Sequence, residues 1–476
     1  MYTLTYIKKF DEHNLDKAEI KKLIERHGSH NLPKLKRNKD YYNGDHIIKN
    51  KMRGDSAPNT KTVCNHAKDI ADISSGYFMG DPITYDNTSE NETDTEPLLL
   101  AFDDAGVDDT DSDNALDMAI YGVAYEYIYA KEGETVLATK TLEPENTFIV
   151  YDDTIEQKPL FAVYYYLRKD DITEESVYIA TVLTENLKYV LNIETKNTIS
   201  EVDETPEEHY MGAIPIICFQ NNRYCIGDFE QQISLIDAYN TLMSDRINDK
   251  EQFIDALLIL YGSQLGDDEK ETSKAAKALR REKLIEMPLD AKAEYLVSSL
   301  DESGAEVLRK AIKEDIYTFS HVPNLTDENF IGNSSGVAME YKLLGLEMIT
   351  RIKTRWYKKG LRKRIELFCN YMGLKNLQTE AKSIIPVFSR ALPKNLSEIA
   401  QVVANLKGTV SQKTLLMQIP FVEDPDDEIG NVAAENEEAM KRQKAMFDNE
   451  PNEPPDFKEP KSKKKGKKKA GGVDEG

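Results

Sequence analysis

The sequence predicts an α+β protein in which a β-rich region is inserted into an otherwise helical chain. Strand-like segments follow one another between about residues 119 and 219, separated by turns rich in Gly, Asp, Asn and Pro. On both sides of this region, apolar residues recur at intervals of three and four, the spacing of amphipathic helices. The 476 residues could hold two or three domains and bury a sizeable core.

Charge and composition exclude several classes of function. The chain has 61 Lys and Arg against 84 Asp and Glu, a formal net charge of -23. A general nucleic-acid binder needs clustered cations, so an acidic chain can enclose nucleic acid but does not grip it. The four cysteines contain no Cys-x-x-Cys pair, which disfavours zinc and fits a reducing cytoplasm. Neither a signal peptide nor a membrane-spanning apolar run is expected.

The N-terminal third predicts helices and an acidic block. Val63, Ala67, Ile70 and Ile73 form a helical stripe, which Gly80-Asp81-Pro82 should end. Between Asp69 and Ala130 there is no Lys or Arg. We expect this block to form an acidic face or loop.

The β-rich region should be antiparallel. Tyr125, Tyr127 and Tyr129 alternate in its first strand. Further strands are expected at 135–141, 147–151, 160–167, 176–183, 188–193 and 214–219, each bounded by turn residues.

Two helices with an insertion between them are predicted next. Asp228 and Gln231 have capping spacing, and the helix that they open could continue to Tyr261. Residues 263–302 form the insertion, with a charged helix at about 273–283 and a strand at 294–300. Ser303 and Glu306 make a second capping box, which opens a helix to about residue 320.

A polar loop and a long helix follow. Apolar residues recur at helical spacing from Leu344 to Met372, so the helix could extend from about 335 to 373, beyond the usual roughly 8–20 residues. The loop before it carries Asp327, Glu328 and several amides, without a nucleophile–base pair or metal spacing. This favours contact with a partner over bond chemistry. A strand at 383–388 and helices at 397–406, 411–417 and 424–447 come next, and residues 450–476 should be disordered.

Two polar clusters suggest sites, and neither is persuasive. Asp109, Asp111 and Asp113 have calcium-loop spacing, but Asn114 replaces the required Gly and Ile120 the bidentate Glu. A solvated acidic turn before a helix is the favoured interpretation. His66 lies near Cys64 without an evident orienting partner, and no P-loop for ATP hydrolysis occurs.

The long helix is locally basic. Its cations are Arg351, Lys353, Arg355, Lys358, Lys359, Arg362, Lys363 and Arg364. We favour a solvated or subunit-pairing face over phosphate contact, because the acidic block at 69–130 needs a counterpart. The run Lys461–Lys469 could bind nucleic acid or an acidic partner, or serve as a solubilising tail.

Several segments resemble the portal proteins of siphovirus-type tailed bacteriophages, the head-to-tail connector family. They are YYNGDHII at 41–48, NTKTVCNHAKDIADISSGYFMGDPITY at 59–85, AIYGVAYEYIY at 119–129 and GTVSQKTLLMQIPFVEDPDDEI at 408–429. The most specific segment is 293–347, and the resemblance extends over most of residues 38–440.

The resemblance implies a portal-type subunit with a β-rich wing, long stem and wing helices, a small α/β clip and a helical crown. The expected divisions are wing 1–227, stem helix 228–262, clip 263–302, second stem helix 303–322, tunnel loop 323–335, long wing helix and returning strand 336–392, crown 393–449 and a disordered Pro/Lys-rich tail 450–476.

It also implies a non-enzymatic role without cofactor or membrane. Such subunits form a ring, typically of twelve, at one capsid vertex of the virion, after assembly in the host cytoplasm. Double-stranded DNA enters through the ring during packaging and leaves during ejection. The implied partners are the terminase large subunit, the major capsid and scaffolding proteins and a head-completion adaptor.

Candidate residues follow for three surfaces. The tunnel loop would line the DNA channel with Asn324, Thr326, Asp327, Glu328, Asn329, Asn333 and Ser334. The candidates for subunit contact are Arg351, Arg355, Arg362, Lys363 and Arg364. The clip would offer Lys277, Arg280, Arg281 and Lys283 to terminase or adaptor.

Two alternatives stay open at this point. A metal-dependent enzyme acting on nucleic acid could hold its metal on the Asp109–Asp113 cluster. An oligomeric cytoplasmic adaptor could assemble without DNA.

Overall fold

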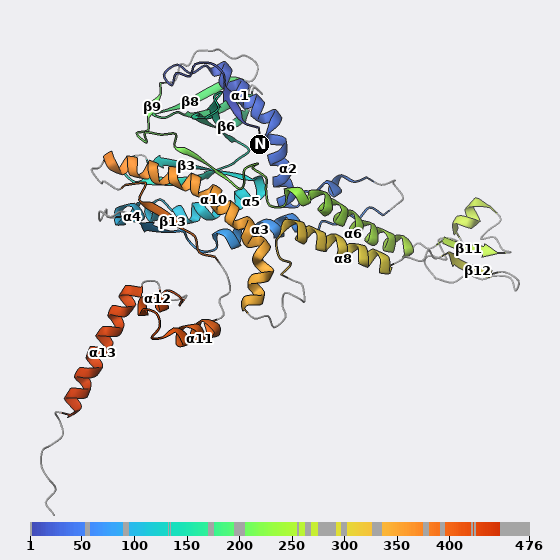
Figure 1. Ribbon diagram of the computed structural model, residues 1–476. Coiled ribbons are helices and arrows are strands. Elements are labelled where there is room, and N and C mark those ends of the chain that lie inside the picture. The colour runs from blue at the N-terminus through green and yellow to red at the C-terminus, as the bar shows by residue number, and fades with distance from the viewer. Residues whose placement is uncertain are drawn as a thin grey trace, which may run out of the picture. The chain divides into compact units, whose positions relative to one another are not determined.

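The computed structural model contains two compact units, residues 1–392 and 393–476 (Figure 1). Both helices and sheets are present, as the sequence predicts. The structure describes residues 2–447 except 53–57, 89–94, 132, 134, 170–175, 195–204, 255–256, 262–267, 275–291, 297–301, 326–335, 375–379, 391–395, 420–421 and 423–424. No helix in these described ranges combines the length and apolar content needed to cross a bilayer.

The first two helices of the first unit follow one another closely in the chain. The helix α1 (Lys17–His30) begins where the Asp16 carboxylate accepts hydrogen bonds from the N–H groups of Ala18 and Glu19. The helix α2 (Leu32–Asn43) ends at Gly44, whose φ of 82° suits glycine. A short 3-10 helix, η1 (Ile47–Asn50), follows.

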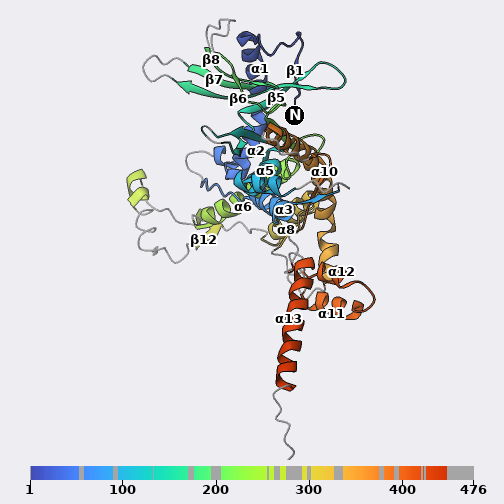
Figure 2. The same cartoon turned by 90° about the vertical axis from the view of Figure 1, so that its left-hand side faces the viewer.

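A six-stranded sheet covers α1, as Figure 2 shows. The strand order is β1-β5-β6-β7-β8-β9, with β1 parallel to β5 and the other pairs antiparallel. Ile20, Leu23 and Ile24 of α1 pack in one core with inward residues of the sheet. The strands are β1 (Leu4–Tyr6), β5 (Thr147–Asp152), β6 (Pro159–Lys169), β7 (Ser176–Leu183), β8 (Leu187–Glu194) and β9 (Glu207–Glu208).

A three-stranded antiparallel sheet, in the order β10-β3-β4, forms the centre of the unit. The predicted strands are thus confirmed, but they divide between two sheets. The strands are β3 (Val123–Ala130), β4 (Leu137–Leu142) and β10 (Ile216–Gln220), and the helices around them include α3 (His66–Met79), α4 (Glu96–Asp104) and α5 (Val107–Tyr121). Gly122 follows α5 at φ 85°, where a Cβ would lie 2.3 Å from the Cys225 carbonyl oxygen.

Two long helices leave this body side by side in Figure 1. They are α6 (Ile233–Ile254), preceded by the 3-10 helix η2 (Glu230–Gln232), and α8 (Glu302–Ser320). The prediction that the first helix reaches Tyr261 was wrong. Leu257–Tyr261 is the strand β11, paired antiparallel with β12 (Lys292–Leu296), because a short apolar run fits either state and tertiary pairing decides.

The predicted long helix is confirmed as α10 (Gly336–Leu374). It bends along its length in Figure 1. Thr350 and Thr354 each donate a hydrogen bond to the carbonyl four residues earlier, a contact that bends helices. The returning strand is also confirmed, since β13 (Ile384–Val387) pairs antiparallel with β2 (Thr84–Asn87).

The second unit contains the three predicted helices. They are α11 (Leu396–Leu406), α12 (Gln412–Leu416) and α13 (Pro425–Phe447). Ser411 caps α12 by accepting the Thr414 N–H. The C-terminal run that should be disordered lies outside the described residues.

Candidate functional site

Charged side chains fix α6 against α8. The Arg246 guanidinium donates to Glu306 and Glu302, both at 3.0 Å, and Arg309 donates to Glu306 at 2.6 Å. Arg309 and then Arg246 hold the pKa of Glu306 at about 2, below its ordinary value. The two predicted stem helices therefore form one paired element. The Ser303 capping box was wrong, because α8 already begins at Glu302 and the Glu306 carboxylate faces the two arginines.

A polar ladder on α6 holds the extended segment 59–64. Asn248 accepts the Thr60 N–H at 2.6 Å and donates to the Thr60 carbonyl at 3.2 Å. Ser244 accepts the Thr62 N–H at 3.0 Å. Asn240 accepts the Cys64 N–H at 2.8 Å. All three ladder side chains are buried.

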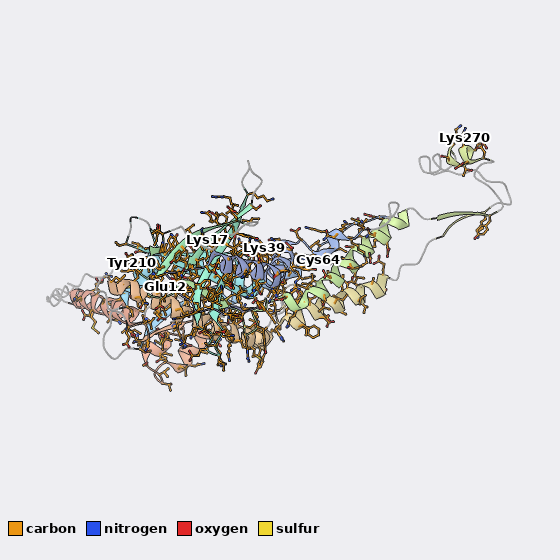
Figure 3. The ribbon with its side chains drawn as sticks, turned by 90° about the horizontal axis from the view of Figure 1, so that it is seen from above. Glu12, Lys17, Lys39, Cys64, Tyr210 and Lys270 are labelled. Atoms are coloured by element: carbon orange, nitrogen blue, oxygen red, sulfur yellow. The ribbon has the colours of Figure 1, made fainter. Side chains whose placement is uncertain are left out.

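The hydrogen bonds of the ladder can repeat because four residues of a helix and two residues of an extended chain span nearly the same distance. Four residues of a helix advance by about 6 Å, and two residues of an extended chain by about 6.6 Å. The i, i+4, i+8 positions Asn240, Ser244 and Asn248 thus meet alternate residues of the segment. These short polar side chains hydrogen-bond the backbone of segment 59–64 as a neighbouring strand would. The helix α6 is therefore attached to the body by hydrogen bonds as well as by apolar packing. Figure 3 shows Cys64 beside this helix.

The sequence interpretation missed this ladder. A signal was present: polar residues that can both donate and accept recur every fourth position on one helix face. The apolar spacing of a single helix shows such residues only as polar interruptions. It does not identify the residues with which they form hydrogen bonds.

The end of α8 is anchored just before the predicted tunnel loop. The Tyr317 hydroxyl donates to Asp69 at 2.6 Å and also contacts His66 Nδ1 at 3.2 Å. Burial lowers the pKa of His66 and raises that of Tyr317. His66 is thus oriented by a tyrosine of α8. Asn324 is half-buried beyond this anchor, while Thr326, Asp327, Glu328, Asn329, Asn333 and Ser334 lie outside the described residues.

The buried face of α10 is polar as well as apolar. Lys353 donates to Asp228 at 2.7 Å and to Ser74 at 3.0 Å. Asn221 also donates to Asp228, at 2.7 Å. The predicted capping role of Asp228 was therefore wrong, because its carboxylate joins three elements instead of opening a helix.

The prediction that Arg364 contacts a neighbouring subunit was wrong. Its side chain is fully buried, and its guanidinium donates to Asp111 at 2.6 and 3.0 Å and to Glu126 at 2.5 Å. Tyr357 donates to the same Asp111 carboxylate. Burial raises the pKa of Glu126 despite the guanidinium. Arg364 thus pairs with the acidic block inside its own chain and is not available to a neighbour.

The other candidate cations lie on the opposite face of α10. Arg355, Arg362 and Lys363 are exposed. Arg351 is exposed as well and donates to Glu347 at 2.9 Å. These four positions are accessible to another molecule.

The aspartate cluster at 109–113 has a structural explanation. These residues lie inside α5, so the predicted turn before a helix was wrong. Asp111 faces inward to Arg364, while Asp109 and Asp113 are exposed. Across the described residues, no group of three or more His, Cys, Asp or Glu is arranged to hold a metal.

The clip candidates Lys277, Arg280, Arg281 and Lys283 lie outside the described residues. Within the same predicted division, 263–302, the structure describes β12 and a short helix at 269–274. That helix carries the Lys270 labelled in Figure 3.

The polar networks described above join helices and strands of the same chain to one another. A family model described as "Phage portal protein, SPP1 Gp6-like" matches residues 21–442. The chain therefore belongs to this portal protein family, whose members are structural, non-enzymatic components of the phage head-tail connector.

Individual relatives agree. The chain is 25% identical over 461 residues to the portal protein of Bacillus phage SPP1, covering 91% of this chain and 89% of that protein. It is 22% identical over 414 residues to the portal protein of Clostridium phage phiCD119, covering 81% and 89%. Among solved structures, a chain from the neck of a native GTA particle computed with C12 symmetry aligns with a TM-score of 0.43 and 10% identity, covering 75% of this chain and 91% of that one.

Proposed function

We propose that this chain forms a ring, of twelve subunits as the family resemblance suggests, at one capsid vertex. Double-stranded DNA enters the capsid through the ring during packaging and leaves through it during ejection. The observation that carries the proposal is the family match over residues 21–442. The paired helices α6 and α8, attached to the body by the Asn240–Asn248 ladder, fit the stem of such a subunit.

The loop at 323–335 is proposed to line the channel. It follows directly on the Tyr317 anchor, so α8 presents it from a fixed base. Asn324, Thr326, Asn329, Asn333 and Ser334 offer amides and hydroxyls for loose contacts with DNA. Asp327 and Glu328 oppose tight binding, because carboxylates repel the phosphates.

The remaining divisions keep their proposed partners. The clip at 263–302, with Lys277, Arg280, Arg281 and Lys283, would meet the terminase large subunit and later the head-completion adaptor. The major capsid and scaffolding proteins are further proposed partners of the chain. Arg351, Arg355, Arg362 and Lys363 would contact a neighbouring subunit, and Arg364 is withdrawn from that set because it is buried.

Electron microscopy of the purified full chain tests the ring. We expect closed rings with an axial hole, and a protein that stays monomeric at high concentration would contradict the proposal. Deleting 327–331 tests the channel separately: rings should remain, while DNA packaging or retention falls. Normal packaging by the shortened protein would tell against the tunnel-loop assignment.

A further inference from the structure

One face of α10 carries an exposed apolar row followed by an exposed cationic row. Tyr341, Leu344, Met348 and Ile352 are 74%, 51%, 62% and 52% exposed. Arg355, Lys359, Arg362 and Lys363 continue the same face at intervals of four, three and one, and all are exposed. We call these eight residues the α10 stripe.

The apolar row has the character of an interface. Four large side chains on successive turns make a continuous exposed patch, unlike the scattered single residues that any surface carries. The opposite face of the same helix buries Tyr357, Leu361 and Phe368 in the body. The described part of the chain therefore uses one side of α10 for its core and leaves the other open.

A second surface shows the complementary order. On α4, Leu99 and Leu100 are 39% and 58% exposed. Asp103 and Asp104 follow on the same helix, and Asp108 and Asp109 on the first turn of α5 are exposed too. We call these six residues the α4–α5 patch. Along the chain, the apolar residues of this patch are followed by acidic ones, just as the apolar residues of the α10 stripe are followed by cationic ones.

The two surfaces lie on far sides of a shared core. Phe102 of α4 packs edge-on against Phe368 of α10, with ring centroids 4.8 Å apart. The buried faces of the two helices thus meet, so the residues exposed on each helix lie on its other sides. Distinct complementary surfaces on different sides of one molecule suit a head-to-tail interface, which closes into a ring when the rotation permits.

We propose that the α10 stripe of one copy docks on the α4–α5 patch of the next copy. Leu99 and Leu100 cover part of the apolar row, and the aspartates face the cationic row. The apolar contact supplies affinity, while the charges fix the register of the two helices and exclude the reversed arrangement. The inference rests on the proposed ring and names the surfaces that build it.

Charge exchange tests the docking in the full chain. Arg362→Glu with Lys363→Glu, and separately Asp103→Lys with Asp104→Lys, should each raise the protein concentration for half assembly by about tenfold or more. Combining the four substitutions should restore assembly to near the wild-type concentration, because opposite charges face each other again. Analytical ultracentrifugation and native mass spectrometry give the readout, and circular dichroism checks folding.

Two further variants sharpen the result. Met348→Glu with Ile352→Glu should abolish rings at concentrations where the wild type is fully assembled. Arg168→Glu with Lys169→Glu, an Arg-Lys pair exposed on β6, is the matched control and should leave assembly unchanged.

Different outcomes overturn different claims. A combined variant that assembles no better than the weaker of its parents overturns the docking. So does a loss of assembly from the α10 reversal without one from the α4 reversal, since some other surface would then cover the stripe. Wild-type chains that form no ring at any concentration overturn the docking and the proposed function together.

Discussion

Arg364 on α10 donates two hydrogen bonds to the carboxylate of Asp111 on α5, at 2.6 and 3.0 Å, with both side chains buried. The bidentate contact joins residues 253 positions apart in the chain. Glu126 on β3 accepts from the same guanidinium. The Arg364 guanidinium thus holds α10 against α5 and against β3 of the three-stranded sheet.

Replacing Arg364 with Met should lower the free energy of unfolding by about 3–5 kcal/mol, because two carboxylates stay buried without their partner. The loss should grow as pH rises. Burial raises the pKa of Glu126 even beside the guanidinium, which acts to lower it, so removing Arg364 raises this pKa further. A carboxyl with a raised folded-state pKa contributes stability below its unfolded-state pKa and loses that contribution as pH rises through the folded-state pKa. Urea titrations at pH 5 and pH 8 measure both effects.

The exposed neighbour provides the control. Measured in dissociated chains, Arg362→Met should change stability by less than about 0.5 kcal/mol, as surface substitutions usually do. Equal losses from the two arginine variants would show that the buried cluster does not hold the helix.

Replacing Asn240 with Leu should release the segment 59–64 locally. The Cys64 N–H loses its acceptor, and the contact between Asn240 Nδ2 and His46 Nδ1 at 2.7 Å is lost. Leaving such buried groups unpaired costs about 1–3 kcal/mol. Hydrogen exchange should show faster exchange of the Thr60, Thr62 and Cys64 amides. Thr241→Ala on the same helix should leave these rates unchanged, and unaltered protection in the Asn240 variant would refute the ladder.

Two glycines of α10 should respond oppositely to alanine. At Gly360 a Cβ would lie 2.5 Å from the Phe219 ring, whereas at Gly373 nothing lies within 4 Å. Phe219 is fully buried, so it has little room to move. We expect Gly360→Ala to cost about 1–3 kcal/mol through overpacking, and Gly373→Ala to be neutral or stabilise by up to about 1 kcal/mol. Thermal unfolding of both variants measures this, and a neutral Gly360→Ala would contradict the close packing.

Acid should weaken the attachment of α1 to the six-stranded sheet through His27. Burial lowers the pKa of His27 to about 4, and its Nδ1 lies 3.0 Å from the Tyr165 hydroxyl. The unfolded chain takes up a proton on this imidazole near pH 6.5, so stability falls as pH drops from about 6.5 towards 4. The loss from this group between pH 7 and pH 5 is about 2 kcal/mol.

Urea titration of wild type and His27→Gln at the two pH values isolates this contribution. The variant should lose less stability on acidification than the wild type. The exposed His13, replaced by Gln in a parallel variant, should leave the pH dependence as it is. A His27→Gln protein that responds to pH like the wild type would rule out the imidazole as its source.

Much of the element list was predictable because long periodic segments carry their own signal. The apolar spacing from Leu344 to Met372 predicts α10 almost to its ends. The boundary errors occurred where two states compete over a few residues. Leu257–Tyr261 fits a helix or a strand, and only its pairing with Lys292–Leu296 makes it β11.

The sequence by itself determined the class of protein: the α+β pattern, the long helices and the family segments are all properties of neighbouring residues. Tertiary structure alone decided which charges are functional candidates. Arg362, Lys363 and Arg364 are adjacent and chemically alike, yet the helix turns the first two to solvent and the third into a buried cluster with Asp111 and Glu126. The physical reason is that burial and partners belong to the packed chain, because a helix rotates successive residues by about 100° and only its neighbours determine which face is covered.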